Sequence, residues 1–237
     1  PSTLKFIKAK GIKSISWSND DMYGWHNRSL WYTLGLKQYD LVVTQKSYNC
    51  NQDELPSLGA KTFFQNKAFE PKVHYPVKSC DTYTYVHDVV FVGAMEEDRL
   101  AQLIYLAQND IKVHIYGWVK EVNNVIHPNL IFHNRFLFEE EFSAALGCSK
   151  IALNFLRKMN RDQQTSRSVE IPASGGFMLA ERTDEHMQLF EEGKEADFFS
   201  SKEELLQKVQ YYLQHDTERL AIAKAGYDRC FKDNYTF

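Results

Sequence analysis

Short apolar runs alternate with segments in which apolar residues recur every three or four positions. The clearest run, residues 88–94 (DVVFVGA), is typical of a strand buried on both faces of a parallel sheet. The segment after it places Leu100, Leu103 and Ala107 on one helical face. This alternation predicts βαβ units and a parallel, doubly wound sheet. Further strands are expected at 112–117, 129–134, 151–156, 176–181 and 195–199, and further helices at 139–146, from 201 and at about 217–231.

The first half of the chain shows the same alternation less clearly. Strands are expected at 12–18, 40–45 and 61–66, with helices around 30–36 and 52–58. The segment that follows contains Pro71 and Pro76 and has no clear periodicity, which indicates a linker. We therefore expect two Rossmann-like lobes with a cleft between them, residues 1–78 and residues 79–237.

One segment of the second half is chemically unusual. Residues 166–181 (SRSVEIPASGGFMLAE) predict a short helix that carries Arg167 and Glu170, reaches Pro172, and turns through two glycines into an apolar strand. Such a compact return places a charged pair near the start of a helix beside the predicted sheet.

Composition and charge make several classes of protein less favoured. The formal net charge of −3 over 237 residues gives no general attraction to nucleic acid or to anionic membranes. No apolar run approaches the ~20 residues that cross a bilayer. The four cysteines are scattered without a C-x-x-C pair, so we expect reduced thiols and a cytoplasmic protein. Because the chain starts at Pro1 rather than Met, we expect a piece of a longer protein, with an incomplete N-terminal lobe.

Candidate chemistry gathers where the predicted strands of the second half end. In open α/β sheets, ligands bind beyond the carboxyl ends of the strands, beside helix N-termini. Cations there suit phosphates, a carboxylate suits ribose hydroxyls, and an aromatic side chain suits a base. These types predict a site for a nucleotide diphosphate. The candidate donor-binding residues are Gly93, Arg99, Gly117, Trp118, Asn154, Arg157, Lys158, Ser166, Arg167, Glu170 and Thr183.

Each candidate also has a purely structural interpretation. Arg157 and Lys158 fit a solvated loop, Trp118 fits a surface aromatic, and Glu170 fits a helix-surface carboxylate paired with Arg167 or Lys194. Lone glycines after strands are commonly tight turns. The chain lacks the G-x-G-x-x-G, Walker A, H-E-x-x-H and G-x-S-x-G motifs, and its eight histidines show no metal-ligand spacing, so no metal site is expected.

The run from residue 166 to 229, with its block SRSVEIPASGGFMLAE, resembles the C-terminal part of the CgeB-like (spore-maturation) glycosyltransferases. The segments DVVFVGA, IYGW and SKIALNF match the same family upstream in the right order, and the first half resembles the end of the family's N-terminal domain. The resemblance implies a GT-B fold, similar to the family-4 retaining glycosyltransferases. It also implies a nucleotide-sugar donor, most readily a UDP-sugar, and no required metal or other cofactor.

The resemblance assigns roles to particular residues. Glu170 takes the position of a carboxylate that holds the donor's ribose hydroxyls. The related enzymes carry an E-x7-E pair, and here the earlier position is Asp162, a shorter side chain that puts its sugar contact in doubt. Arg167 is then either a phosphate partner or a clamp on Glu170. Asp20 and Asp21 are the catalytic candidates, to assist the acceptor or hold the sugar, although helix capping by Asn19 or Asp20 is an equal alternative.

The sequence therefore predicts a glycosyltransferase that moves a sugar, with retention, from a nucleotide-sugar bound by the second lobe. Its acceptor, a glycan, protein or small molecule, would bind the first lobe. Two alternatives remain open: a non-catalytic nucleotide- or glycan-binding module on the same scaffold, and a glycosyltransferase that acts on modified nucleic acid.

Overall fold

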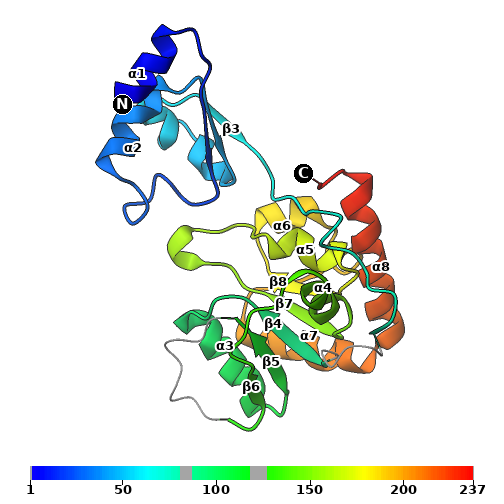
Figure 1. Cartoon of the computed structure of the whole chain (residues 1–237). Coiled ribbons are helices and arrows are strands. Elements are labelled where there is room, and N and C mark those ends of the chain that lie inside the picture. Colours follow the sequence, from blue (N-terminus) through cyan, green and yellow to red (C-terminus); the bar gives the residue numbers. More distant parts are fainter. Residues whose placement is uncertain (1, 81–86, 118–126, 237) are drawn as a thin grey trace. The chain divides into compact units, whose positions relative to one another are not determined.

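The computed structural model describes residues 2–80, 87–117 and 127–236, which form two compact units (Figure 1). The first unit comprises residues 1–67 and 157–163, and the second comprises residues 68–156 and 164–237. The division lies earlier than the expected boundary at 78/79. Phe69 is already part of the second unit because its ring is fully buried there and its N–H donates to the Tyr235 carbonyl at 2.9 Å. Residues 81–85 of the expected linker lie outside the described residues.

The second unit contains a six-stranded parallel sheet with the order β6-β5-β4-β7-β8-β9. The chain builds it outward from β4 in one direction and then from β7 in the other, so the strand order reverses between these two neighbours. The doubly wound sheet predicted from the sequence is confirmed. The strands are β4 (Val89–Val92), β5 (Val113–Tyr116), β6 (Leu130–Phe132), β7 (Ile151–Asn154), β8 (Met178–Glu181) and β9 (Asp197–Phe199).

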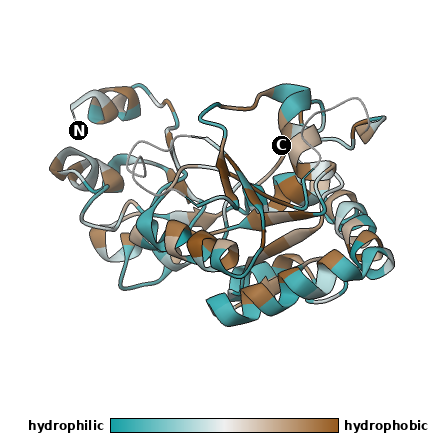
Figure 2. Ribbon diagram, turned by 90° about the horizontal axis from the view of Figure 1, so that it is seen from below, coloured by the Kyte–Doolittle hydropathy of each residue, from teal (hydrophilic) through white to brown (hydrophobic). Residues whose placement is uncertain are grey.

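Helices cover both faces of this sheet, because successive residues of each strand face opposite sides. Val89 and Phe91 pack on α3, α7 and the first part of α8, whereas Val90 and Val92 pack with α4, α5 and α6. Figure 2 shows hydrophobic strands between helices with hydrophilic outer faces. The helices are α3 (Glu97–Gln108), α4 (Glu139–Gly147), α5 (Arg167–Ala173), α6 (Asp184–Leu189), α7 (Lys202–Gln214) and α8 (Asp216–Lys232).

Helix caps explain two of these boundaries. Ser201 accepts a hydrogen bond from the Glu204 N–H at 3.1 Å, so α7 begins where the capping-box spacing predicts. The six-residue helix α6 was not expected. Thr183 caps it by accepting from the His186 N–H at 3.1 Å, and a helix this short leaves little periodicity in the sequence.

Gly117 allows two strand ends to approach closely. It follows β5 with a φ of 127°, and a Cβ atom there would lie 2.3 Å from the Gly93 carbonyl oxygen that follows β4. The Gly93 N–H in turn donates to the Tyr116 carbonyl at 2.9 Å. A side chain at residue 117 would therefore push apart the loops at the carboxyl ends of β4 and β5.

A disulfide joins Cys80 and Cys148, whose Cα atoms are 5.4 Å apart. The expectation that all four cysteines are free thiols is wrong for this pair, and Cys50 and Cys230 are free. Sequence spacing does not reveal the pair because 68 positions separate its members and neither belongs to a short motif.

The first unit is a smaller α/β unit around a three-stranded parallel sheet, β1-β2-β3. Leu36, Val42, Leu55 and Ala60 form its core on one face of the sheet. The helix expected at 52–58 is a 3₁₀ turn over Leu55–Leu58, in which Pro56 is compatible with the first turn. The elements are α1 (Ser2–Ala9), β1 (Ile15–Ser18), α2 (Leu30–Gly35), β2 (Leu41–Thr44) and β3 (Thr62–Phe64), with 3₁₀ turns at Leu36–Gln38, Ser47–Cys50 and Lys158–Asn160.

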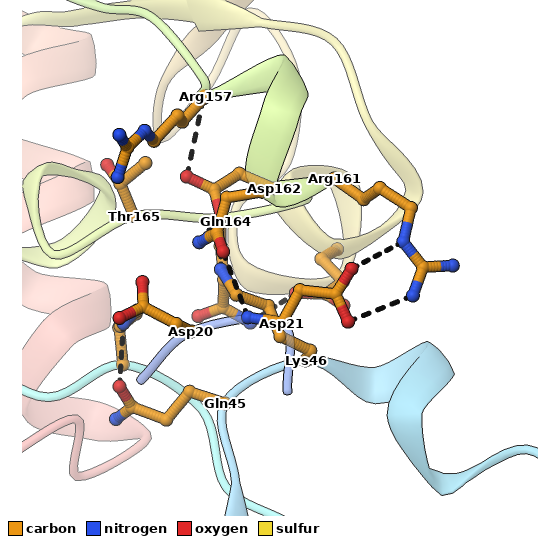
Figure 3. Close-up of polar contacts among 12 residues, drawn as sticks. Asp20, Asp21, Gln45, Lys46, Arg157, Arg161, Asp162, Gln164 and Thr165 are labelled. Atoms are coloured by element: carbon orange, nitrogen blue, oxygen red, sulfur yellow. Dashed lines mark hydrogen bonds and ion pairs between the residues drawn. The ribbon is translucent and has the colours of Figure 1, made fainter. Parts of the chain in front are cut away.

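Segment 157–163 belongs to the first unit through an ionic cluster centred on Arg161 (Figure 3). The guanidinium donates to both Asp21 oxygens, from Nε at 2.6 Å and from Nη2 at 2.9 Å. It also donates from Nη1 to Glu54 at 2.7 Å, while the Asn49 amide bridges the two carboxylates at 2.9 and 2.8 Å. Arg161 stacks over the Tyr48 ring at 4.3 Å. Two buried carboxylates thus depend on one arginine from a distant segment.

Asp21 remains ionised within this cluster. Burial raises the pKa of its carboxyl, but the hydrogen bonds from Arg161 and Asn49 outweigh burial and hold the pKa below its usual value. A carboxylate whose pKa is lower in the folded state stabilises the fold above the unfolded-state pKa of about 3.9. That contribution is lost as the pH falls through the lower folded-state value.

Arg161→Met should destabilise the first unit by about 3 kcal/mol at pH 7, because it leaves two buried carboxylates without their cation. Breaking a buried ion pair costs roughly 3–5 kcal/mol. We expect a loss at the low end of this range because 45% of the Arg161 side chain is exposed. Urea denaturation followed by tryptophan fluorescence measures it, because Trp17, Trp25 and Trp31 lie in this unit.

Lys13→Met is the matched control within the same unit, since Lys13 is 84% exposed in its pair with Asp40 and should contribute far less than Arg161. The difference between wild type and Arg161→Met should shrink as the pH falls below about 3.9. Equal losses for the two variants at pH 7 would contradict the structural role of Arg161.

Gly117→Ala should destabilise the second unit more than Gly193→Ala does. Both glycines have positive φ, 127° and 72°, but a Cβ at Gly193 meets nothing within 4 Å. Gly193→Ala should therefore lose only the roughly 1–2 kcal/mol of stability that a side chain costs at positive φ. Gly117→Ala should lose more, because its Cβ would also clash with the Gly93 carbonyl oxygen. Urea denaturation followed by circular dichroism compares them, and equal midpoints would show that the close approach to Gly93 contributes nothing.

Candidate functional site

A pocket of about 220 Å³ opens in the second unit where the strand order reverses. Its walls come from the carboxyl ends of β4 and β7, from the start of α3 and from the start of α5. The reversal separates the connections that leave the two neighbouring strands, so no crossover fills the space between them. The lining residues are Phe91, Val92, Gly93, Arg99, Asn154, Phe155, Thr165, Ser166 and Arg167.

Two arginines give the pocket a positive charge. Arg99 lies in the first turn of α3, is largely buried, and donates from Nη1 to the Ala94 carbonyl at 2.7 Å. Arg167 starts α5, donates from Nε to the Val92 carbonyl at 2.9 Å, and stacks over the Phe142 ring at 4.4 Å. Both guanidiniums are oriented by backbone carbonyls, so little conformational freedom remains to be lost when an anion binds.

Glu170 lies one helical turn after Arg167 and is held by it. Arg167 Nη1 donates to Glu170 Oε2, and His74 Nε2 lies 3.6 Å from Glu170 Oε1. Burial lowers the pKa of His74 below its ordinary value although Glu170 opposes the shift. The carboxylate keeps lone pairs available beyond these contacts, since an ionised carboxyl accepts about four hydrogen bonds. Its position beside the pocket suits a ligand that presents hydroxyl groups.

A buried hydrogen-bond network orders the pocket wall between β7 and α5. His186 Nδ1 lies 2.7 Å from the Glu181 carbonyl, which can only accept, so this nitrogen carries the proton. His186 Nε2 therefore accepts from the Ser168 hydroxyl at 2.7 Å, and burial lowers the pKa of His186 to about 4. Ser168 in turn accepts from Asn154 at 3.1 Å and from the Thr165 N–H at 2.9 Å. The network fixes Asn154 and Thr165 at the pocket.

Five of the residues singled out from the sequence line this pocket together: Gly93, Arg99, Asn154, Ser166 and Arg167. Gly117 supports it from outside, through its close approach to Gly93. Glu170 contacts Arg167, so the structure shows the clamp that the sequence left as one of two alternatives. Thr183 is instead the cap of α6.

Other candidates lie elsewhere. Arg157 and Lys158 are exposed and belong to the first unit, and Trp118 lies outside the described residues. Asp162, at the earlier position of the carboxylate pair, has a largely buried side chain that is paired with Lys46, and it also accepts from the Asn160 amide at 2.8 Å. Its oxygens are thus engaged within the first unit (Figure 3).

The two catalytic candidates differ from each other. Asp21 is fully buried and bound by Arg161, which is a structural role, whereas Asp20 is exposed. Helix capping by Asn19 or Asp20 is wrong, because the next helix among the described residues starts at Leu30 with Ser29 as its cap. Asn19 instead accepts from the Trp17 indole at 3.0 Å.

Sequence reasoning missed Thr165 and His74. Thr165 directly precedes the segment that drew attention, so extending that segment by one residue would have included it. His74 gave no signal, because it lies in the stretch between two prolines that was interpreted as a linker. Ser143 Oγ donates to the Val73 carbonyl at 2.7 Å, which ties this stretch to α4.

Three histidines form a separate group in the same sheet. His87, His114 and His133 present ring nitrogens within 4.8 Å of one another, although the sequence shows no metal-ligand spacing. They come from different strands, so the fold alone brings them together. Imidazole nitrogens are ligands for ions such as zinc.

Solved structures share this fold at low sequence identity. HepE from Anabaena in complex with UDP superposes with a TM-score of 0.70 and 12% identity, over 97% of this chain and 70% of that chain. A glycosyltransferase from Rickettsia africae gives 0.66 and 10%, over 99% and 76%. Sucrose-phosphate synthase from Thermosynechococcus elongatus gives 0.63 and 12%, over 84% and 55%. These GT-B structures confirm the fold class expected from the sequence.

Sequence comparison identifies the family. No curated protein matches the chain. Residues 95–237, more than half of the chain, match the family described as glycosyl transferase-like, and this match contains most of the pocket's polar residues. The chain therefore belongs to the glycosyl transferase-like family and is a transferase with the GT-B fold.

Proposed function

We propose that the protein transfers a sugar from a nucleotide-diphosphate-sugar, most readily a UDP-sugar, and that the pocket at the strand reversal binds this donor. One observation carries the proposal: two oriented arginines and a clamped carboxylate meet at the switch point of a doubly wound sheet. Ligands of such sheets bind at that point. Cations and a carboxylate match the diphosphate and the ribose of one molecule.

Arg99 and Arg167 are the proposed partners of the diphosphate. The bond from the sugar to the diphosphate breaks during transfer, and negative charge develops on the departing phosphate oxygens. Guanidiniums already oriented toward that charge stabilise it without reorganising, usually the largest contribution to catalysis. Arg167 also binds Glu170, so its charge is partly neutralised before the donor arrives, and Arg99 is the stronger candidate for the phosphates.

Glu170 is the proposed partner of the ribose hydroxyls. The Arg167 contact holds the carboxylate in one orientation, which lowers the entropy that ordering it on binding would cost. Each hydroxyl that donates to an ionised carboxylate makes a charge-assisted hydrogen bond. Arg167 and Glu170 would therefore bind the phosphate and the ribose of the same ligand.

Known complexes support the choice of base. HepE structures contain UDP and UDP-glucose, so we propose uracil as the base of this protein's donor. We also propose retention of configuration and membership of the CgeB-like group, related to family 4, on the block of residues 166–181. A glycan, protein or small molecule is the proposed acceptor, and of the two catalytic candidates the exposed Asp20 is the one that we propose to assist it.

The alternative function is a nucleotide- or glycan-binding module without catalysis. Asp162 favours it, because this carboxylate is already paired with Lys46 where the resemblance requires a sugar contact. An assay for nucleotide release distinguishes the two functions. A transferase should release nucleotide when it hydrolyses the donor or transfers its sugar, whereas a binding module should not. Modified nucleic acid as the acceptor is less favoured, since the formal net charge is −3.

A thermal-shift panel of UDP, GDP, ADP and TDP and their sugars tests the donor assignment on the intact protein. A ligand at ~100 times its dissociation constant stabilises the native state by about 2.7 kcal/mol. UDP and UDP-sugars should give the largest shifts. A panel without any shift would contradict the proposed donor site, and a preference for another base would contradict uracil.

Glu170→Gln and Glu170→Ala should weaken UDP binding roughly 10- to 1,000-fold, because they remove charge-assisted hydrogen bonds to two ribose hydroxyls. Isothermal titration measures the dissociation constants. Glu191→Gln is the matched control, since Glu191 forms the same i,i+3 type of pair with Lys194 on an exposed surface. Unchanged UDP affinity in both Glu170 variants would remove the ribose assignment.

No described helix is long and apolar enough to cross a bilayer. The sequence led us to propose the cytoplasm, whereas the Cys80–Cys148 disulfide favours an oxidising compartment, so the state of this pair tests the proposal. A reducing compartment should leave four thiols that alkylate when cells are lysed into the reagent, whereas an oxidising one should leave two. Mass spectrometry counts them, and two alkylated thiols would contradict a cytoplasmic location.

A further inference from the structure

The histidine group lies in the second unit, across the strands β4, β5 and β6. His87 is two residues before β4, His114 is the second residue of β5, and His133 directly follows β6. His87 is buried, and the other two side chains are half-buried. Neighbouring strands of one sheet hold the three backbones, so the spacing of the rings is set by a rigid element.

The ring nitrogens are close enough to share one ion. His114 Nδ1 lies 3.0 Å from His133 Nε2, and the ligand atoms of all three residues lie within 4.8 Å of one another. Zinc–nitrogen bonds of about 2.0–2.1 Å place two nitrogens of a tetrahedral site about 3.4 Å apart. Bringing the third nitrogen to that distance requires a side-chain rotation rather than a backbone movement.

The chemistry of the group selects the class of ion. A neutral imidazole offers the lone pair of one ring nitrogen to a metal ion. Three nitrogen donors suit zinc, nickel, copper or cobalt and do not suit magnesium or calcium, which prefer oxygen. The carboxylate of Asp88, the residue after His87, is paired with Lys150 Nζ at 2.6 Å and is not counted among the proposed ligands.

We propose that His87, His114 and His133 form a binding site for one divalent transition-metal ion of the zinc class, separate from the donor pocket. The site is independent of the proposed transfer reaction. Three histidine ligands leave a fourth position for water or for a further group. The Tyr116 hydroxyl lies 2.8 Å from His87 Nε2.

Binding requires one ring to turn. A histidine lone pair lies in the plane of its ring, and the His87 ring is stacked on His114 with centroids 3.6 Å apart and an angle of 12°. Both rings cannot direct a lone pair at one ion in that arrangement. His87 must rotate and give up its contact with the Tyr116 hydroxyl, so an ion would replace a stacked cluster by a cross-link between three strands.

Titration of the metal-free protein with Zn²⁺ and with Co²⁺ tests the site, with Mg²⁺ as the comparison. We expect one Zn²⁺ per chain, a higher melting temperature with zinc, and no response to Mg²⁺. The visible spectrum of bound Co²⁺ reports a four-coordinate nitrogen environment, and a thiolate charge-transfer band would instead indicate binding at the free Cys50.

Single variants assign the ligands. His87→Gln, His114→Gln and His133→Gln should each weaken Zn²⁺ binding by more than the roughly 10- to 100-fold that loss of an outer-sphere partner costs. His215→Gln is the control, since that ring stacks on Tyr211 at the end of α7. Melting of each metal-free variant shows whether it has folded, and a folded variant that keeps its zinc affinity excludes that histidine.

Three outcomes would overturn the proposal. They are no zinc binding by folded wild-type protein, zinc binding that survives any one of the three substitutions in a folded variant, and a response to Mg²⁺ equal to that for Zn²⁺. Any of these would leave the histidines as a stacked, hydrogen-bonded cluster. UDP binding, measured on the same variants, should be unchanged, which keeps this test separate from that of the donor pocket.

Discussion

The reversal of strand order between β4 and β7 is the constraint on which the rest of the second unit depends. Each half of the sheet sends its connections away from this point, so the carboxyl ends of two central strands stay uncovered. Gly117 lets the loop after β5 lie against the Gly93 carbonyl beside the pocket, because a Cβ atom at residue 117 would clash with that oxygen. On the other side, the buried His186 network holds the wall after β7.

Two arginine–carboxylate clusters show that the surroundings of such a pair, rather than its chemistry, distinguish a structural contact from a candidate site. Arg161 binds Asp21 and Glu54, and an amide and backbone N–H groups complete the contacts of these carboxylates. These contacts stabilise the first unit. Arg167 and Glu170 also bind each other, but Arg167 lines the pocket at the strand reversal. We propose that the same chemistry binds a nucleotide there.

The sequence predicted what depends on local pattern. The buried run at 88–94, the capping box at Ser201 and the helix–glycine–strand return after Ser166 all appear in the structure, and five pocket residues follow from the rule for parallel sheets. What it missed depends on distant segments. The pairing of Asp21 with Arg161 spans 140 positions, the three histidines come from separate strands, and Cys80 meets Cys148 across the fold.

Residue type alone does not separate structural roles from functional ones. Asp21 was a catalytic candidate because an acidic residue after a strand suits an active site, yet its full burial beside Arg161 makes it structural. Arg157 and Lys158 share the charge expected of phosphate partners, but segment 157–163 folds with the first unit. Burial and partner choice, which decide these roles, arise only when the chain is folded.

A crystal structure of the protein grown with UDP tests the central claim most directly. The account predicts the nucleotide in the pocket at the strand reversal, with its diphosphate on Arg99 or Arg167 and its ribose hydroxyls on Glu170. Nucleotide bound elsewhere on the chain, or a ribose that does not contact Glu170, would contradict it.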